Sequence, residues 1–140
     1  MNRYITLLLI LFHFTAMFAE KVPTDTILSR YFSRAASLMS IGKYSEAQET
    51  FDSAFSTKGV KESYVYPILL NEQATLLVYI GKIEEAFEMK KNVLKYIGRI
   101  DNLETKISVY NDLAIMYRQR HVNDSTIYYY NKALNTALQY

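Results

Sequence analysis

The feature of the sequence that most constrains the fold is a segment that occurs twice. The stretch "IGKYSEAQETFDSAF" begins at Ile41 and returns as "IGKIEEAFEMKKNVL" at Ile80, and the two residue numbers differ by 39. A period of this length is typical of repeat proteins, in which each repeat buries its apolar face against the next one. We therefore expect a chain built from stacked copies of one small unit.

The four glycines of the chain fall into the same register. Gly42 pairs with Gly81 and Gly59 pairs with Gly98, each at a distance of 39 residues. Between Gly42 and Gly59 the apolar residues recur at steps of three and four, which indicates an amphipathic helix. We expect Gly59 and Gly98 to follow such helices in the left-handed conformation, which glycine adopts without a steric penalty.

Another helix is expected upstream of Gly42 and another upstream of Gly81, so that the unit is a helix, a tight turn and a helix. The first helices are predicted over about 27–41, 64–80 and 101–120, and the last helix runs from about 123 to the end of the chain. The expected capping residues are Thr24 or Asp25, then Ser63, then the capping-box pair Asp101 and Glu104, and finally Asn123 or Asp124.

Small and large residues keep one spacing through three copies of the unit. A small residue of the first helix stands 12 positions before a small residue of the second, and a large residue follows four residues later. Small residues allow the two helices of a hairpin to approach closely, while the large ones fill the space against the next hairpin. The three sets are Ala35, Ala47 and Phe51, then Ala74, Ala86 and Lys90, then Ala114, Thr126 and Tyr130.

This pattern resembles the tetratricopeptide repeat (TPR), which places an aromatic residue, Leu-Gly and Tyr before an Ala and a Phe. The best match is Tyr31, Leu38, Gly42, Tyr44, Ala47 and Phe51 in the first copy, followed by Leu70, Leu77, Gly81 and Ala86, and by Tyr110, Leu113, Tyr117 and Tyr130. Arg34, Gln73 and Lys90 depart from the pattern, the closing proline is missing, and the family's usual period is about 34 residues.

The resemblance implies an all-α fold, a right-handed superhelical solenoid of three TPR-like hairpins with six helices. The expected units are about 28–66, 67–106 and 107–140. It also implies a protein-binding or peptide-binding groove on the concave face, where the first helices lie. Similar lengthened repeats occur in bacterial regulators that sense peptides or carry an exported sensor region.

The beginning of the chain has the layout of a secretory signal over residues 1–19, followed by a linker over 20–27. Arg3 precedes an apolar run at residues 5–18, which as a helix of about 1.5 Å per residue is too short for a ~30 Å hydrocarbon core. Met17 stands where a cleavage site prefers a small residue, so both cleavage after Ala19 and an uncleaved membrane anchor stay open. Either way we expect an exported bacterial protein, periplasmic or membrane-associated.

No catalytic, metal-binding or cofactor-binding motif appears in the sequence. Its two histidines are isolated, it has no cysteine, and its formal net charge of +2 is too small to indicate nucleic acid. The acidic residues Glu84, Glu85 and Glu88 alternate with lysines, as on a solvated helix face. We therefore predict a protein that is not an enzyme, without metal or cofactor, whose partner is a protein or a peptide.

The groove predicted by register has candidate residues on all three first helices. Asn71 and Asn111 occupy equivalent places and could bind a peptide backbone, or they could be two solvated polar residues. The candidate groove residues are Phe32, Met39, Asn71, Thr75, Val78, Asn111, Ile115 and Arg118. The expected function is a non-catalytic binding module outside the cytoplasm, and the sensor part of a regulatory system is one form that it could take.

The last predicted helix has no following helix to cover it. Tyr130 is expected in the core by register, and Tyr128 and Tyr129 at a hairpin edge or in contact with a partner. Self-association, a docking partner, or kinship with a longer sensor would each explain apolar residues near the end. The alternative function is therefore a structural homo-oligomer or cell-envelope assembly component that associates through Tyr128, Leu134, Leu138 and Tyr140.

Overall fold

The computed structural model describes residues 23–139, and within this range every regular element is helical. The expected leader, residues 20–22 of the expected linker and Tyr140 lie outside the described residues. None of the described helices combines the length and the apolar character that a bilayer span requires. The elements are α2 (Thr24–Ser40), α3 (Tyr44–Phe55), η1 (Val60–Glu62), α4 (Tyr66–Tyr79), α5 (Ile83–Val93), η2 (Leu94–Arg99), α6 (Leu103–Gln119) and α7 (Asn123–Ala137).

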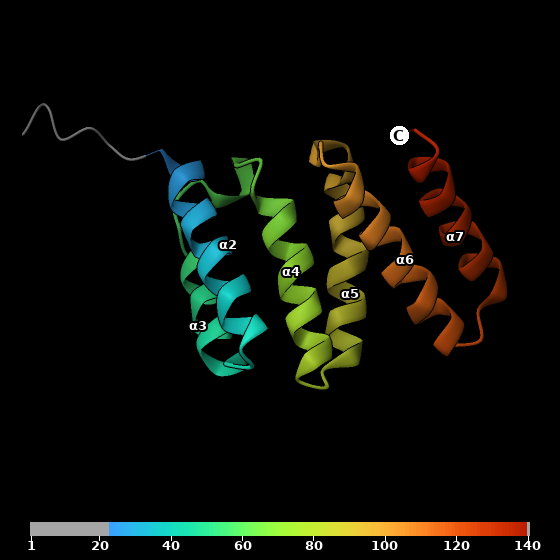
Figure 1. Cartoon of the computed structure of the whole chain (residues 1–140), viewed down its shortest axis with the longest axis horizontal. Coiled ribbons are helices and arrows are strands. Elements are labelled where there is room, and N and C mark those ends of the chain that lie inside the picture. Colours follow the sequence, from blue (N-terminus) through green and yellow to red (C-terminus); the bar gives the residue numbers. More distant parts are fainter. Residues whose placement is uncertain (1–22, 140) are drawn as a thin grey trace, which may run out of the picture.

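The six α-helices form three successive hairpins. The pairs α2–α3, α4–α5 and α6–α7 make the most extensive contacts, and α3–α4 and α5–α6 join neighbouring hairpins. Figure 1 shows the three hairpins in a row that follows the chain order. The expected all-α class is confirmed, and this pairwise packing is consistent with a helical repeat.

The core is built on the small residues that the repeat predicted. Ala35, Ala47, Ala74, Ala86 and Ala114 are fully buried, so the helices of each hairpin can approach closely at these positions. Helix α4 lies between the first and the last hairpin and is buried on most of its circumference. A helix that is apolar nearly all round is expected in such a central place.

The three hairpin turns share one backbone motif. Gly42 and Gly81 have φ of 74° and 80°, and His121 takes the same place in the third hairpin with φ of 59°. In each turn this residue donates to the carbonyl three residues back, and the next residue donates to the carbonyl five residues back. This is a Schellman motif, and it ends the first helix of every unit. The five-residue bonds are Lys43 N to Leu38 O, Lys82 N to Leu77 O and Val122 N to Tyr117 O.

Replacing Gly81 by alanine should therefore lower the free energy of unfolding by about 1–2 kcal/mol, because an L-residue is strained in the left-handed conformation. No atom lies within 4 Å of a Cβ added at Gly81, so the cost comes from the backbone alone. His121→Ala is the matched control and should change stability by less than about 0.5 kcal/mol, since an L-residue already occupies that turn. Urea denaturation measures the free energy of unfolding of both variants. Equal losses would contradict the view that the cost at Gly81 comes from its left-handed backbone.

The two outer glycines differ from each other. Gly59 has φ of 79°, so its predicted left-handed conformation is confirmed, but it lies four residues after the end of α3 and directly precedes η1. Gly98 lies inside η2 and is not among the residues with positive φ, so the prediction for Gly98 was wrong. In the second unit the chain continues from α5 directly into a 3₁₀-helix, and no left-handed residue is needed to end it.

Several predicted caps were also wrong by a few residues. Asn102 caps α6, and its Oδ1 accepts from the backbone N–H of Thr105 at 2.7 Å, in place of the expected pair Asp101 and Glu104. No side-chain cap bond forms at the starts of α2 and α7, so Thr24, Asn123 and Asp124 do not act as caps. The hydroxyl of Ser63, the cap expected before α4, accepts from the backbone N–H of Val65 at 3.0 Å. Asp25 instead accepts a hydrogen bond from the Ser63 hydroxyl, which ties the first helix to the chain just before α4.

Candidate functional site

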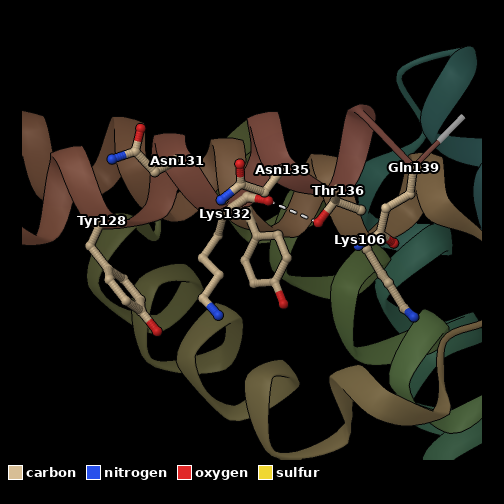
Figure 2. A pocket seen from close by; sticks show the side chains of 8 residues that line it. Lys106, Tyr128, Asn131, Lys132, Asn135, Thr136 and Gln139 are labelled. Carbon is tan, nitrogen blue, oxygen red and sulfur yellow. Dashed lines mark hydrogen bonds between the residues drawn. The ribbon is translucent and has the colours of Figure 1, made fainter.

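A polar pocket of about 400 Å³ lies between α6 and α7 (Figure 2). Its lining contains two lysines, Lys106 and Lys132, and no acidic residue, and the ammonium of Lys132 lies 5.6 Å from the centre of the Tyr128 ring. The remaining lining residues are Tyr110, Asn131, Asn135, Thr136 and Gln139. Tyr128, predicted to belong to an association face, thus faces this α6–α7 pocket.

Tyr129 is half-buried and packs against α6 inside the last hairpin. Its ring is stacked on Tyr117 at 5.4 Å and on Tyr110 at 6.4 Å. Burial raises the pKa of the Tyr129 hydroxyl above its ordinary value. The stack fastens α7 to α6, and Phe87 of the preceding hairpin meets its other end edge-on at Tyr117.

The opposite side of α7 carries an exposed apolar stripe. Its members recur at three-residue and four-residue steps and therefore share one face of the helix. We call this stripe the outer face of α7; it consists of Ile127, Tyr130, Leu134 and Leu138. Tyr130 is 36% exposed although its register equivalent Phe51 is fully buried, so its expected place in the core was wrong: no described element follows α7 to cover it.

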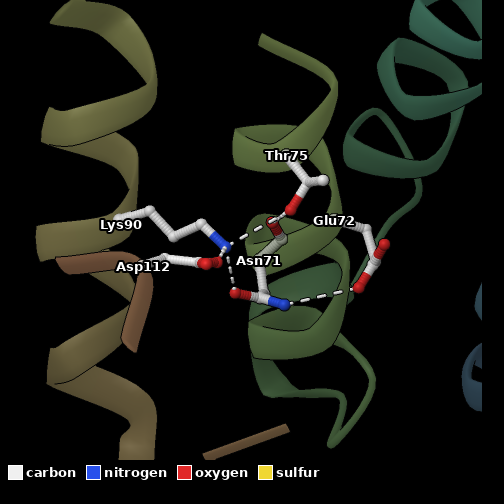
Figure 3. A network of polar contacts seen from close by, with 5 residues as sticks. All are labelled: Asn71, Glu72, Thr75, Lys90 and Asp112. Carbon is white, nitrogen blue, oxygen red and sulfur yellow. Dashed lines mark hydrogen bonds and ion pairs between the residues drawn. The ribbon is translucent and has the colours of Figure 1, made fainter. Parts of the chain in front are cut away.

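Lys90 of α5 is the residue of the second hairpin that is equivalent to Phe51 and Tyr130, and it is fully buried. Figure 3 shows its ammonium surrounded by three oxygen atoms from α4 and α6. Lys90 Nζ lies 2.7 Å from Asn71 Oδ1, 3.3 Å from Thr75 Oγ1 and 2.6 Å from Asp112 Oδ2. The lysine is 1% exposed, so its three N–H groups are all used inside the protein. A charged group thus stands where the first repeat places a phenylalanine.

Asn71 is part of this cluster and is not exposed in a groove as predicted. Its side-chain oxygen accepts from Lys90, and its amide donates to Glu72 Oε1 at 3.3 Å. The residue is 2% exposed, which leaves no edge of the amide for a peptide backbone. Asn111 is half-buried on α6, so the two asparagines do not form the expected exposed pair. We call Asn71, Glu72, Thr75, Lys90 and Asp112 the Lys90 network.

A groove of about 280 Å³ lies above this network, between α4 and α6. Three predicted groove residues line it together, namely Thr75, Val78 and Ile115. The lining also includes Lys90 and Asp112, which are joined by the ion pair. The sequence reasoning missed six lining residues: Tyr79, Ile83, Lys90, Asp112, Met116 and Gln119.

The other predicted groove residues lie elsewhere. Phe32 and Met39 are partly buried on α2 and pack against the core, so they do not line this α4–α6 groove. Arg118 is exposed on α6 and is not among the lining residues either. One sequence signal could have located the groove floor, because Lys90 is the only charged residue among the three equivalent positions Phe51, Lys90 and Tyr130.

Glu72 gives the network a pH dependence. Burial raises the pKa of its carboxyl above the ordinary value, although Lys90 and the hydrogen bond from Asn71 oppose this shift. Because the folded state then holds the proton more tightly, stability falls as pH rises from the unfolded pKa through the raised folded pKa. Glu72→Gln keeps an oxygen that can accept from Asn71, so we expect it to raise stability at neutral pH and to remove this fall.

Denaturant titrations between about pH 4 and pH 8 would test this effect. The control is Glu85→Gln, which removes an exposed carboxylate paired with Lys82 and should change stability by less than about 1 kcal/mol at any pH. If Glu72→Gln lowers stability at neutral pH, then the ionised carboxylate stabilises the fold and the expected sign of the pH dependence is wrong.

Comparison with known proteins identifies no relative of this chain. No family model matches it, and neither a curated protein nor a solved structure matches it significantly. Within residues 23–139, no cluster of histidine or acidic side chains is placed to hold a metal ion. The candidate binding sites of the described residues are the α4–α6 groove, the α6–α7 pocket and the outer face of α7.

Proposed function

We propose that the chain is an exported, non-catalytic binding module of the TPR type, a right-handed superhelical solenoid that holds a protein or peptide in the α4–α6 groove. One observation carries the proposal: Thr75, Val78 and Ile115, predicted from register alone to face a ligand, line a single pocket. Such a module suits the sensor part of a regulatory system in the bacterial periplasm or at a membrane.

The chemistry of the groove fits an anchored protein segment. Apolar side chains dominate its walls, and Val78 and Ile115 are 39% and 37% exposed, so a ligand would remove them from water. Each buried apolar side chain of a ligand contributes about 1.5–3 kcal/mol before the entropic cost of binding. A few polar atoms at the floor would then fix its orientation.

The outer face of α7 supports a second candidate, a structural homo-oligomer or envelope assembly component. Leu134 takes the register of Phe55, which contacts Tyr66 of the next hairpin edge-on at 6.1 Å between ring centres. The face by which one hairpin covers the next is therefore open on α7. Contact of this face with another copy would remove apolar surface from water without burying a charge.

One experiment separates the two functions. The full chain is used as bait in a cross-linked cell-envelope extract, and molar mass is measured by light scattering, for wild type, Ile115→Glu and Leu138→Glu. Both substitutions place the same charge on an exposed apolar residue, so each controls for the other. We expect Ile115→Glu to lower recovery of a distinct partner at least about 10-fold, the equivalent of 1.4 kcal/mol, with Leu138→Glu unchanged.

Unchanged recovery with Ile115→Glu would overturn the groove as the binding site. A wild-type protein that recovers only itself, scatters as a dimer or larger, and becomes monomeric with Leu138→Glu would move the function to the outer face of α7.

A further inference from the structure

We infer that the α4–α6 groove selects a ligand group that carries a cationic nitrogen next to an apolar side chain. This inference rests on the proposed function, because it concerns the chemistry of the same groove. It follows from a difference in access between the two charged residues of its lining, Lys90 and Asp112.

Lys90 cannot contact a ligand through its charge. Its side chain is 1% exposed, and its three donors are directed to Asn71, Thr75 and Asp112. A ligand carboxylate would have to displace one of these acceptors to reach the ammonium. The ammonium of Lys90 is therefore fully engaged by residues of the protein itself.

Asp112, in contrast, can be reached by a ligand. Its side chain is 34% exposed, and only Oδ2 is engaged, by Lys90 at 2.6 Å. Among the described residues, no hydrogen bond is made to Oδ1. A carboxylate oxygen accepts and never donates when it is ionised, so the charged group that the groove offers to a ligand is an acceptor. Hydrogen bonds between such an oxygen and a cationic donor are about twice as strong as neutral ones.

The charges around the α4–α6 groove also favour a cationic ligand. The network holds one ammonium, that of Lys90, and two carboxyl groups, those of Glu72 and Asp112. The other charged contacts of this region pair internally, since Arg120 binds Glu84 at 2.7 Å across α6 and α5. Arg118 is exposed on α6 but lies outside the lining. A ligand cation near Asp112 therefore meets a region with at least as much negative as positive charge.

The size and walls of the groove define the rest of the ligand. The volume of about 280 Å³ is at the lower limit of small-molecule pockets, so it can hold one or two side chains and not a whole peptide. Val78, Tyr79, Ile83, Ile115 and Met116 form an apolar wall beside Asp112. The matching group is an aromatic or aliphatic side chain beside a lysine or arginine, or beside a free N-terminal ammonium.

Three small probes with the same phenyl ring test this inference on the full chain: phenethylammonium (cationic), 3-phenylpropanamide (neutral) and 3-phenylpropionate (anionic). Methyl NMR signals of Ile83, Ile115 and Met116 report binding in the groove. We expect phenethylammonium to bind at least about 5-fold tighter than 3-phenylpropionate, and Asp112→Asn to reduce this ratio to about 1. Because Asp112→Asn strands the buried Lys90 charge, the double variant Lys90→Met, Asp112→Asn repeats the measurement without either charge.

The outcomes separate the inference from the proposed function. Equal binding of all three probes, or preference for the anion, overturns the charge selection and leaves the groove as an apolar site. Failure of every probe to shift the three methyl signals counts against the groove itself. Two dipeptides then distinguish the sources of the cation, Ac-Phe-Lys-amide for a side chain and Phe-Gly-amide for an N-terminus. A cation that shifts the three methyl signals while the anion leaves them unchanged supports the selection.

Discussion

Asp112→Leu is expected to lower the free energy of unfolding by about 3–5 kcal/mol, because it leaves the buried ammonium of Lys90 without its counterion. The Lys90 side chain is 1% exposed, and its ammonium would keep direct hydrogen bonds only to the neutral oxygens of Asn71 and Thr75. The double variant Lys90→Met, Asp112→Leu should be far more stable than this single variant, because replacing a buried ion pair by apolar residues is often neutral or stabilising.

Urea denaturation of the wild type, Lys90→Met, Asp112→Leu and the double variant forms a double-mutant cycle. A large favourable coupling between the two substitutions would show that the ion pair acts as a unit. The first repeat supports this expectation, since it accommodates Phe51 at the position of Lys90. Additive losses would instead mean that the two charges stabilise the fold independently, and the buried pair would lose its assigned role.

Phe51→Ala should be the most destabilising single change in the apolar core, at about 3–5 kcal/mol. Its side chain is fully buried, and its ring centre lies 6.5 Å from that of Phe55, which in turn contacts Tyr66 of the second hairpin. Tyr130→Ala changes the equivalent residue of the third unit, but that residue is 36% exposed, so we expect a loss below about 1 kcal/mol. Thermal and urea unfolding measure both variants under the same conditions.

The comparison of these two variants also reports on the outer face of α7. If Tyr130→Ala costs as much as Phe51→Ala, and its cost depends on protein concentration, then a second copy covers this face in solution. If the cost is large at every concentration, then Tyr130 is buried within the monomer and the outer face of α7 is not open.

The sequence by itself determined the repeated unit, because its signals are local in the chain. The spacing of apolar residues at three and four positions predicts helices whatever lies beside them, and Gly42 and Gly81 mark turns that need positive φ. The five buried alanines, which occupy two positions of the repeat, follow from the same register. This periodicity also placed Thr75, Val78 and Ile115 on the side of their helices that lines one groove.

Only the tertiary structure decided which positions of the repeat are filled, covered or open. Lys90 and Asp112 are 22 residues apart and meet because α5 packs against α6, so neither side chain alone indicates an ion pair. Asn71 of α4 is buried and accepts a hydrogen bond from Lys90 of α5, a contact between two helices that a pattern within one helix cannot report. Phe51, Lys90 and Tyr130 share one register, yet the first is covered by apolar surface, the second by oxygen atoms and the third by no described element, because burial depends on the neighbouring hairpin.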